Sequence, residues 1–300
     1  MKKLVLNYRQ NKLLYWMILP VLIYVFIFSY IPMFGLIMSF QDYSLTKGIW
    51  GSKWVGLKNF KDFFGGMYFG RTLGNTLILS GLDLLICFPA PILLALMLNE
   101  VGNMRFKRTI QTVSYMPHFI SMVVVAGLIK EFCSSTGPLA QMAQLWGGEA
   151  RNYLSDPANF RGIFTMSSVW QTIGFNSIVF LAALAGVDMQ QYEAAKIDGA
   201  NRLQQMWHVT LPGIAPTIII MLILRCGSIM NVNFEKVLLL YSHSTYETAD
   251  VISTYVYRVG IIKQKIGYST AVGLFNSVAS LILVLSSNWL SNKLTDSGLF

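Results

Sequence analysis

Apolar residues recur along the chain in six long runs that are separated by polar segments. An α-helix needs about 20 mostly apolar residues to cross the hydrocarbon core of a membrane, and each run has at least that length. The pattern predicts six membrane-spanning helices, kinked at Pro89 and Pro91 in the second and at Pro117 in the third. The predicted ranges are about 13–40, 73–98, 110–129, 162–187, 217–241 and 267–290.

Composition supports a membrane protein. Hydrophobic residues make up 54% of the 300 residues and charged residues only 12%, whereas an average soluble domain is about 25% charged. A soluble protein has no interior large enough for so many apolar side chains, which excludes a cytosolic enzyme and a disordered tail. The three cysteines lie far apart, so a secreted disulfide scaffold and a thiolate metal site are excluded as well.

The net charge of +9 indicates membrane topology rather than nucleic-acid binding. Basic residues divide almost evenly between the two sides of a six-span arrangement, so their number does not orient the chain. Their local density favours an inside N-terminus, because Lys2, Lys3, Arg9 and Lys12 precede the first run.

The loop 188–216, between the fourth and fifth runs, has the pattern of a short helix–turn–helix. Asp188 can cap a helix over 189–198, and Gly199 supplies the left-handed residue that ends it. A second short helix is expected over about 201–209, before the fifth run. From these residues alone, an interfacial helix at the bilayer edge and a docking element for another protein remain equally open.

Three short motifs in this loop carry a family resemblance. Glu-Ala-Ala at 193–195 is followed after two residues by Asp-Gly-Ala at 198–200, and after ten more by Leu-Pro at 211–212. This spacing resembles the EAA loop of the membrane subunits of binding-protein-dependent ABC importers. The chain also resembles the sugar permeases among them, in the branch for complex oligo- and polysaccharides, on the stretches 181–186, 231–235 and 254–258. Arg225 departs from that pattern, since an apolar or small residue is expected there.

The resemblance implies an all-α polytopic membrane protein with six transmembrane helices and the type I ABC importer permease architecture. It places the loop 188–216 and the terminal segments 1–12 and 291–300 in the cytoplasm. The loop would dock into a cleft of an ATP-hydrolysing subunit and move with it, so that the membrane helices open alternately to the two sides. Glu193 would pair with a base on that subunit, and Gly199 would set the bend of the loop. The implied coupling residues are Glu193, Ala194, Ala195, Asp198, Gly199, Ala200, Leu211 and Pro212.

The same resemblance implies the partners and the location. They are a second permease subunit of similar but distinct sequence, a dimer of ATP-binding subunits, an extracytoplasmic solute-binding lipoprotein, membrane lipid and a carbohydrate, with no nucleic acid. The chain would lie in the bacterial inner membrane as a multi-pass transport subunit. It is not expected to be an enzyme or to hold a cofactor or metal, because it has no G-x-x-x-x-G-K-[ST] motif and its three histidines lack metal-ligand spacing.

Polar residues inside apolar runs are costly and tend to be functional. In the fifth run Arg225, Ser228, Asn231 and Glu235 would share a helix face within an arc of about 120°. Arg225 could equally form a structural ion pair with Glu235 or Asp83. Amides, carboxylates and aromatic rings suit sugar hydroxyls and ring faces, so the candidate sugar-path residues are Trp170, Gln171, Asn176, Arg225, Ser228, Asn231, Glu235 and Tyr241.

Two other classes of function stay open at this point. An ion-coupled secondary transporter could use Asp83, Arg225 and Glu235, although the chain shows no inverted repeat. A membrane enzyme acting on lipid-linked sugar would need a carboxylate cluster, and the dense acidic set lies in the helix–turn–helix loop.

Overall fold

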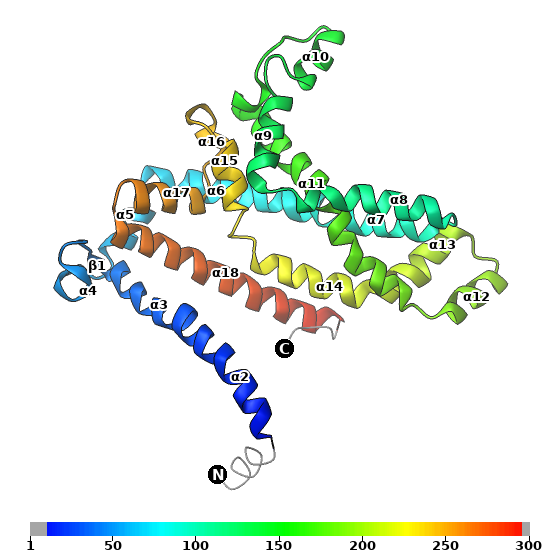
Figure 1. The fold of residues 1–300 in the computed structure, drawn as a ribbon, viewed down its shortest axis with the longest axis horizontal. Helices are drawn as coiled ribbons and strands as arrows, with labels where there is room; N and C mark the ends of the chain where they lie inside the picture. The colour runs from blue at the N-terminus through cyan, green and yellow to red at the C-terminus, as the bar shows by residue number, and fades with distance from the viewer. Residues whose placement is uncertain (1–10, 296–300) are drawn as a thin grey trace. The chain divides into compact units, whose positions relative to one another are not determined.

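The computed structural model describes residues 11–295, which are helical over most of their length (Figure 1). It divides into two compact units. Unit 1 comprises residues 11–66 and Val256–Leu274, and unit 2 comprises Met67–Tyr255 and residues 275–295. The terminal segments expected in the cytoplasm, 1–12 and 291–300, lie largely outside the described residues.

Unit 1 begins with a continuous helical segment over Lys12–Phe40 that is long and apolar enough to cross a membrane. No residue of its first helix is buried, as expected for side chains that lipid solvates. Asn59, in the helix Lys58–Phe64, donates to the carbonyl oxygens of Ser39 and Gln41 at 2.9 and 3.0 Å, which ties the end of this segment to that helix. The elements are α2 (Lys12–Val25), η1 (Phe26–Tyr30), α3 (Ile31–Met33), η2 (Phe34–Phe40), β1 (Gln41–Asp42), α4 (Gly48–Gly51), β2 (Lys53–Trp54), α5 (Lys58–Phe64) and η8 (Arg258–Ile262); β1 and β2 pair antiparallel.

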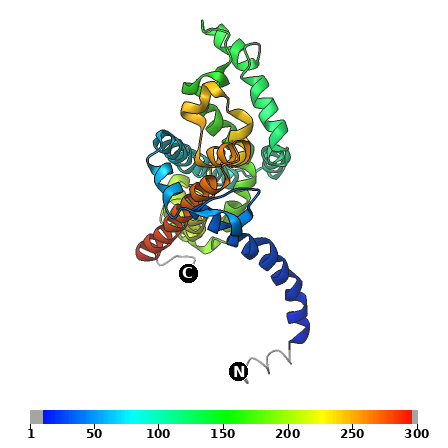
Figure 2. The ribbon, with the colours of Figure 1, turned by 90° about the vertical axis from the view of Figure 1, so that its left-hand side faces the viewer.

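Unit 2 packs around its longest complete helix, α11 (Pro157–Ala185). One apolar cluster surrounds Phe160 and Phe164, and another joins Ala95, Phe180 and Ile214. The segment with α10 (Pro138–Leu145) projects from the other helices of unit 2 in both views (Figures 1 and 2). The remaining elements are α6 (Met67–Leu82), η3 (Asp83–Cys87), α7 (Pro89–Glu100), α8 (Met104–Tyr115), η4 (Met116–Phe119), α9 (Met122–Phe132), η5 (Tyr153–Ser155), α12 (Met189–Ile197), α13 (Arg202–Gln205), η6 (Met206–Thr210), α14 (Leu211–Gly227), α15 (Phe234–Leu240), η7 (His243–Thr245), α16 (Tyr246–Ala249) and α17 (Ile252–Tyr257), and α18 (Ile266–Thr295) runs through both units.

Within residues 11–295, five helical segments are long and apolar enough to cross a membrane, or six if one bent pair is a single span. The all-α fold with six apolar runs is therefore confirmed. The bent pair is the predicted third helix, 110–129, which is not continuous: 104–119 and 122–132 meet at 101°. Pro117 lies at this break and Ser121 caps the helix that follows, so the predicted kink is a full interruption.

The fifth run differs more from its prediction. A single helix over 217–241 is wrong, because α14 ends at Gly227 and α15 begins only at Phe234. Asn233 caps α15, accepting a hydrogen bond from the backbone of Lys236 at 3.1 Å. The predicted break between a loop helix at 201–209 and the fifth run is also absent, since helical structure continues from Arg202 to Gly227.

Candidate functional site

The loop 188–216, called the coupling loop below after its predicted role, begins with a capped helix. Asp188 Oδ1 accepts from the backbone of Gln190 at 3.0 Å, and α12 follows. The helix ends where Gly199 adopts φ +78°, with Ala200 N donating to Ala195 O at 2.9 Å and Gly199 N donating to Lys196 O at 3.1 Å. These two bonds form a Schellman motif, in which a glycine satisfies the last carbonyl groups of the helix. The helix-ending role predicted for Gly199 is confirmed.

The second helix of the coupling loop, which begins at Arg202, is also capped at its start. Asn201 Oδ1 accepts from Gln204 N at 2.9 Å while Gln204 Oε1 accepts from Asn201 N at 2.8 Å, a reciprocal capping box. Tyr192 donates to Thr210 Oγ1 at 3.0 Å and so joins the first helix to the second. The coupling loop is therefore a helix–turn–helix whose two helices are capped and joined by a hydrogen bond. It is also called the elbow below.

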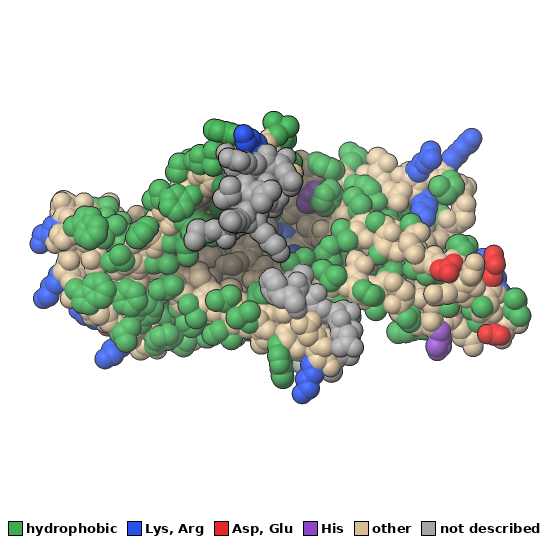
Figure 3. Space-filling model, turned by 90° about the horizontal axis from the view of Figure 1, so that it is seen from below, with side chains coloured by type: hydrophobic (Ala, Val, Ile, Leu, Met, Phe, Trp, Pro, Cys, Tyr) green, Lys and Arg blue, Asp and Glu red, His purple; other side chains and the backbone are tan. Residues whose placement is uncertain are grey.

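The faces of this elbow carry the predicted motif residues. Glu193, Ala194, Asp198, Gly199 and Pro212 are exposed, whereas Ala195, Ala200 and Leu211 are half-buried. Within residues 11–295 no ion pair involves Glu193. Acidic side chains gather at the end of the molecule where α12 and α13 lie (Figure 3). The elbow thus presents small and acidic side chains on an accessible surface.

A cavity opens where the fifth run is interrupted. Irregular backbone at membrane depth is tolerated where it is buried in protein or lines a cavity, and here Ser228, Ile229 and residues 231–233 line one. We call this space the main cavity. It has a volume of about 330 Å³ and is lined by Leu79, Ser80, Asp83, Phe164, Ser168, Gln171, Thr172, Arg225, Ser228, Ile229, Asn231, Val232 and Asn233.

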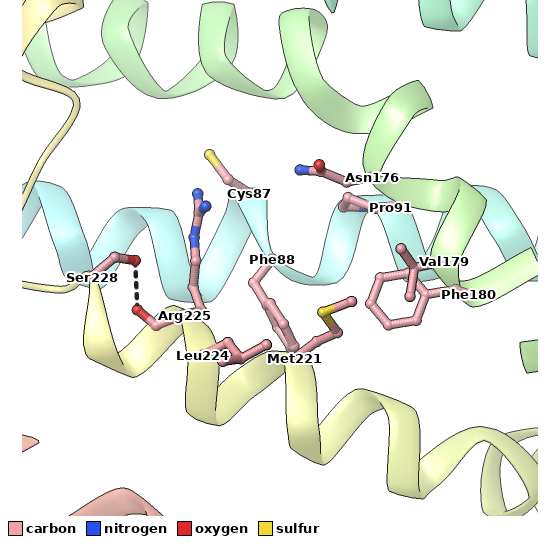
Figure 4. A pocket seen from close by; sticks show the side chains of 10 residues that line it. All are labelled: Cys87, Phe88, Pro91, Asn176, Val179, Phe180, Met221, Leu224, Arg225 and Ser228. Carbon is pink, nitrogen blue, oxygen red and sulfur yellow. Dashed lines mark hydrogen bonds between the residues drawn. The ribbon is translucent and has the colours of Figure 1, made fainter. Parts of the chain in front are cut away.

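A neighbouring side cavity of about 250 Å³ shares Arg225 and Ser228 with the main cavity. Apolar side chains from α7, α11 and α14 form most of its wall, and Arg225 extends from α14 toward the helix segment that carries Cys87 (Figure 4). Asn176 supplies an amide from α11 (Figure 4). The residues that line it are Cys87, Phe88, Pro91, Asn176, Val179, Phe180, Met221, Leu224, Arg225 and Ser228.

Arg225 is the charged link between these cavities. Its Nε and one terminal nitrogen donate to the two carboxylate oxygens of Asp83, both at 2.5 Å. Of the two ion pairs that the sequence leaves open, the one with Asp83 is formed, whereas Glu235 is exposed and lines neither cavity. A bidentate pair of this kind fixes the guanidinium plane and holds η3 against α14.

The predicted sugar-path residues separate into two groups. Five of them line the cavities: Gln171, Asn176, Arg225, Ser228 and Asn231. Trp170, Glu235 and Tyr241 do not, and Tyr241 instead packs beside Tyr246 with ring centroids 5.0 Å apart. The shared helix face predicted for the stripe is wrong, because α14 ends before Ser228, yet Arg225, Ser228 and Asn231 still converge.

One charged residue near the main cavity was missed. Lys236 is 1% exposed, and its Nζ donates to Ser168 Oγ at 2.7 Å and to Phe164 O at 3.2 Å. A cation inside the apolar stretch 234–240 is the sequence signal that could have found it. Within residues 11–295 no three His, Cys, Asp or Glu side chains lie close enough together to hold a metal ion.

Comparisons with known proteins agree with this architecture. LplB of Bacillus subtilis (strain 168) is 47% identical over 97% of this chain and 92% of its own length. The polygalacturonan/rhamnogalacturonan transport system permease protein YteP of the same strain is 44% identical over 100% of this chain and 94% of its own. A crystal structure of a bacterial alginate ABC transporter, in complex with an alginate pentasaccharide-bound periplasmic protein, includes a chain that matches with a TM-score of 0.91, 44% identity and 98% coverage of both chains.

The family model for "Binding-protein-dependent transport system inner membrane component" matches residues 88–296. The predicted resemblance and the type I permease architecture are confirmed, and the relatives do not favour an ion-coupled transporter or an enzyme. A family model that matches most of the chain, and relatives that are 44–47% identical over nearly all of it, lead to one assignment: this chain belongs to the binding-protein-dependent transport system inner membrane components, the multi-pass permease subunits of bacterial ABC transporters.

Proposed function

We propose that this permease imports a carbohydrate, an oligosaccharide or a polysaccharide fragment, that an extracytoplasmic binding protein delivers. The main cavity carries the proposal. Interrupted spans mark substrate sites in transporters, and here the interruption meets Gln171, Thr172 and Asn231, whose amides and hydroxyl suit sugar hydroxyl groups. The names of YteP and of the alginate transporter, both concerned with polysaccharides, support the same class of substrate.

The coupling loop is proposed to lie in the cytoplasm, with both chain termini on that side, and to dock on a separate ATP-binding subunit. The exposed Ala194 lets another backbone come close, and the carboxylate of Glu193 is available for a base on that subunit. The Schellman end and the capping box keep the elbow rigid, so that a movement of the ATPase shifts the permease rather than bending the loop. A dimer of ATP-binding subunits, a second, similar permease and a solute-binding lipoprotein complete the proposed transporter.

A substitution at Gly199 tests the docking role. Gly199→Val forces a β-branched residue into a left-handed conformation, which strains the end of α12. We expect normal membrane insertion and abolished uptake. Gly199→Asn is the matched control, because asparagine tolerates this conformation, and it should retain most of the uptake. Normal transport by Gly199→Val would refute the docking role.

The substrate class and the partner require two further measurements. Sugar-stimulated ATP hydrolysis of the purified transporter across a panel of neutral and acidic glycans identifies the substrate. A cysteine introduced at Ala194 should crosslink to the ATP-binding subunit. Labelling of that cysteine from the extracellular side, or stimulation by no glycan, would contradict the proposed function.

A further inference from the structure

Lys236 lies deep in unit 2, on the first turn of α15, directly after the interruption of the fifth run. Its side chain is almost entirely enclosed, and the ammonium sits 4.9 Å from the centroid of the Phe164 ring. Two of its three N–H groups are satisfied by Ser168 Oγ and Phe164 O. Both partners belong to residues that line the main cavity, so a single layer of side chains separates the charge from that space.

No acidic side chain among residues 11–295 forms an ion pair with this ammonium. Asp83, the carboxylate that lines the main cavity, is held by both of its oxygens on Arg225. Glu235, the next acid along the chain, is exposed and lines no part of the cavity. Among the described residues the Lys236 ammonium, which lies behind the wall of the main cavity, therefore has no ion-pair partner, and burial of a charge without a counter-charge is costly.

Ser168 connects this charge to the cavity. Its hydroxyl accepts from Lys236 Nζ and donates to Phe164 O at 2.8 Å. The same hydroxyl can rotate and donate instead to an anionic oxygen in the main cavity while it still accepts from the ammonium. A ligand carboxylate would then be bound through a charge-polarised hydroxyl, in a cavity that Gln171 and Asn231 also line.

We propose that Lys236, acting through Ser168, is the specificity determinant that selects uronate-containing oligosaccharides over neutral ones. The inference rests on the proposed function, since it concerns the sugar in the main cavity. A carboxylate on the sugar supplies the counter-charge that the protein lacks, whereas a neutral sugar leaves the ammonium unpaired. Lys236 is thus a positioning residue for the carboxylate.

The test uses the complete transporter in proteoliposomes, with its binding protein and ATP-binding subunits. The probes are an alginate pentasaccharide and the same pentasaccharide with methyl-esterified carboxyl groups, and the measurement is the concentration for half-maximal stimulation of ATP hydrolysis. Lys236→Gln keeps a hydrogen-bond donor but removes the charge. It should raise that concentration about tenfold for the acidic sugar and leave it unchanged for the ester, as expected when a charge-assisted hydrogen bond is lost.

Controls separate selectivity from stability. Lys130→Gln removes an exposed lysine and should change neither value. Ser168→Ala should mimic Lys236→Gln, and Lys236→Arg should keep the preference for the acidic sugar, so these variants carry the test if Lys236→Gln does not assemble. Equal losses for both sugars, or no loss, would overturn the inference while leaving carbohydrate import intact. A wild-type transporter stimulated by neither sugar, nor by any other glycan, would overturn the proposed function itself.

Discussion

The ion pair between Asp83 and Arg225 allows a quantitative test of how unit 2 is held together. Two charge-assisted hydrogen bonds of 2.5 Å join side chains that are 28% and 40% exposed. Exposed pairs contribute about 0–1 kcal/mol, and breaking a buried pair costs about 3–5 kcal/mol. This half-exposed, bidentate pair lies between those limits, so Asp83→Asn should cost about 2 kcal/mol.

The assay is thermal unfolding of the purified transporter, followed for the permease subunit. At an unfolding entropy of roughly 2.1 cal/mol/K per residue, a loss of about 2 kcal/mol corresponds to a fall in Tm of about 3 °C for a chain of 300 residues. Arg225→Gln should cause a similar fall. The double variant Asp83→Asn/Arg225→Gln should recover much of it, because no uncompensated charge is left in the cavity wall.

A double-mutant cycle makes the prediction refutable. Residues in direct contact couple by about 0.5–3 kcal/mol, whereas independent sites add within about 0.3–0.5 kcal/mol. A coupling of at least about 1 kcal/mol between Asp83 and Arg225 is expected. If the two single losses simply add, the pair contributes nothing specific, and the view of Arg225 as a charge neutralised by Asp83 fails. The unpaired charge assigned to Lys236 would then need to be reconsidered too.

Two further predictions concern packing and capping. A Cβ atom at Gly174 would overlap the backbone carbonyl of Ser114, so Gly174→Ala should separate α11 from α8 at a cost of about 1–3 kcal/mol. Gly162→Ala, on the same helix with open space around it, should leave Tm unchanged. Equal Tm values for the two variants would refute the close contact. Asn201→Ala removes the side-chain acceptor of the capping box, which Gln204 N uses, and should lower sugar-stimulated ATP hydrolysis through a loss of about 1 kcal/mol at the elbow. Asn201→Ser should retain this bond, and identical activities of the two variants would show that the cap has no role in coupling.

The sequence predicts helical spans well because apolar runs of sufficient length have few alternatives in lipid. It predicts the elbow equally well, since Asp188 and Gly199 are strong local signals that require no distant partner. The interruption of the fifth run also has local signals, a glycine at 227 and a capping asparagine at 233. The apolar residues on either side dominate the pattern, so the sequence predicts one continuous helix and places the polar stripe on a helix face that the structure does not form.

The residues that line the cavities could be predicted only in part. Gln171 and Asn231 are polar groups within apolar runs, which is a sequence property, and they do face the cavity. Trp170 is adjacent to Gln171 but does not line that space, and periodicity alone does not choose between neighbours on a helix whose partners are unknown. Lys236 was missed because its importance depends on Ser168 and Phe164, about 70 residues away in the sequence, and only the tertiary structure brings these groups together.

The proposed coupling has a direct mechanical route through unit 2. Helical structure runs without interruption from Arg202, at the elbow, to Gly227, where the main cavity begins. These 26 residues span roughly 39 Å at 1.5 Å per residue. The hydrogen bond from Tyr192 to Thr210 attaches the first helix of the elbow to this helical segment, and Arg225, near the other end of the segment, is bound to Asp83. In the proposed coupling, a displacement of the elbow would reach the cavity through this helix. The non-helical residues 228–233 can absorb that movement, so α15 and Lys236 need not follow it.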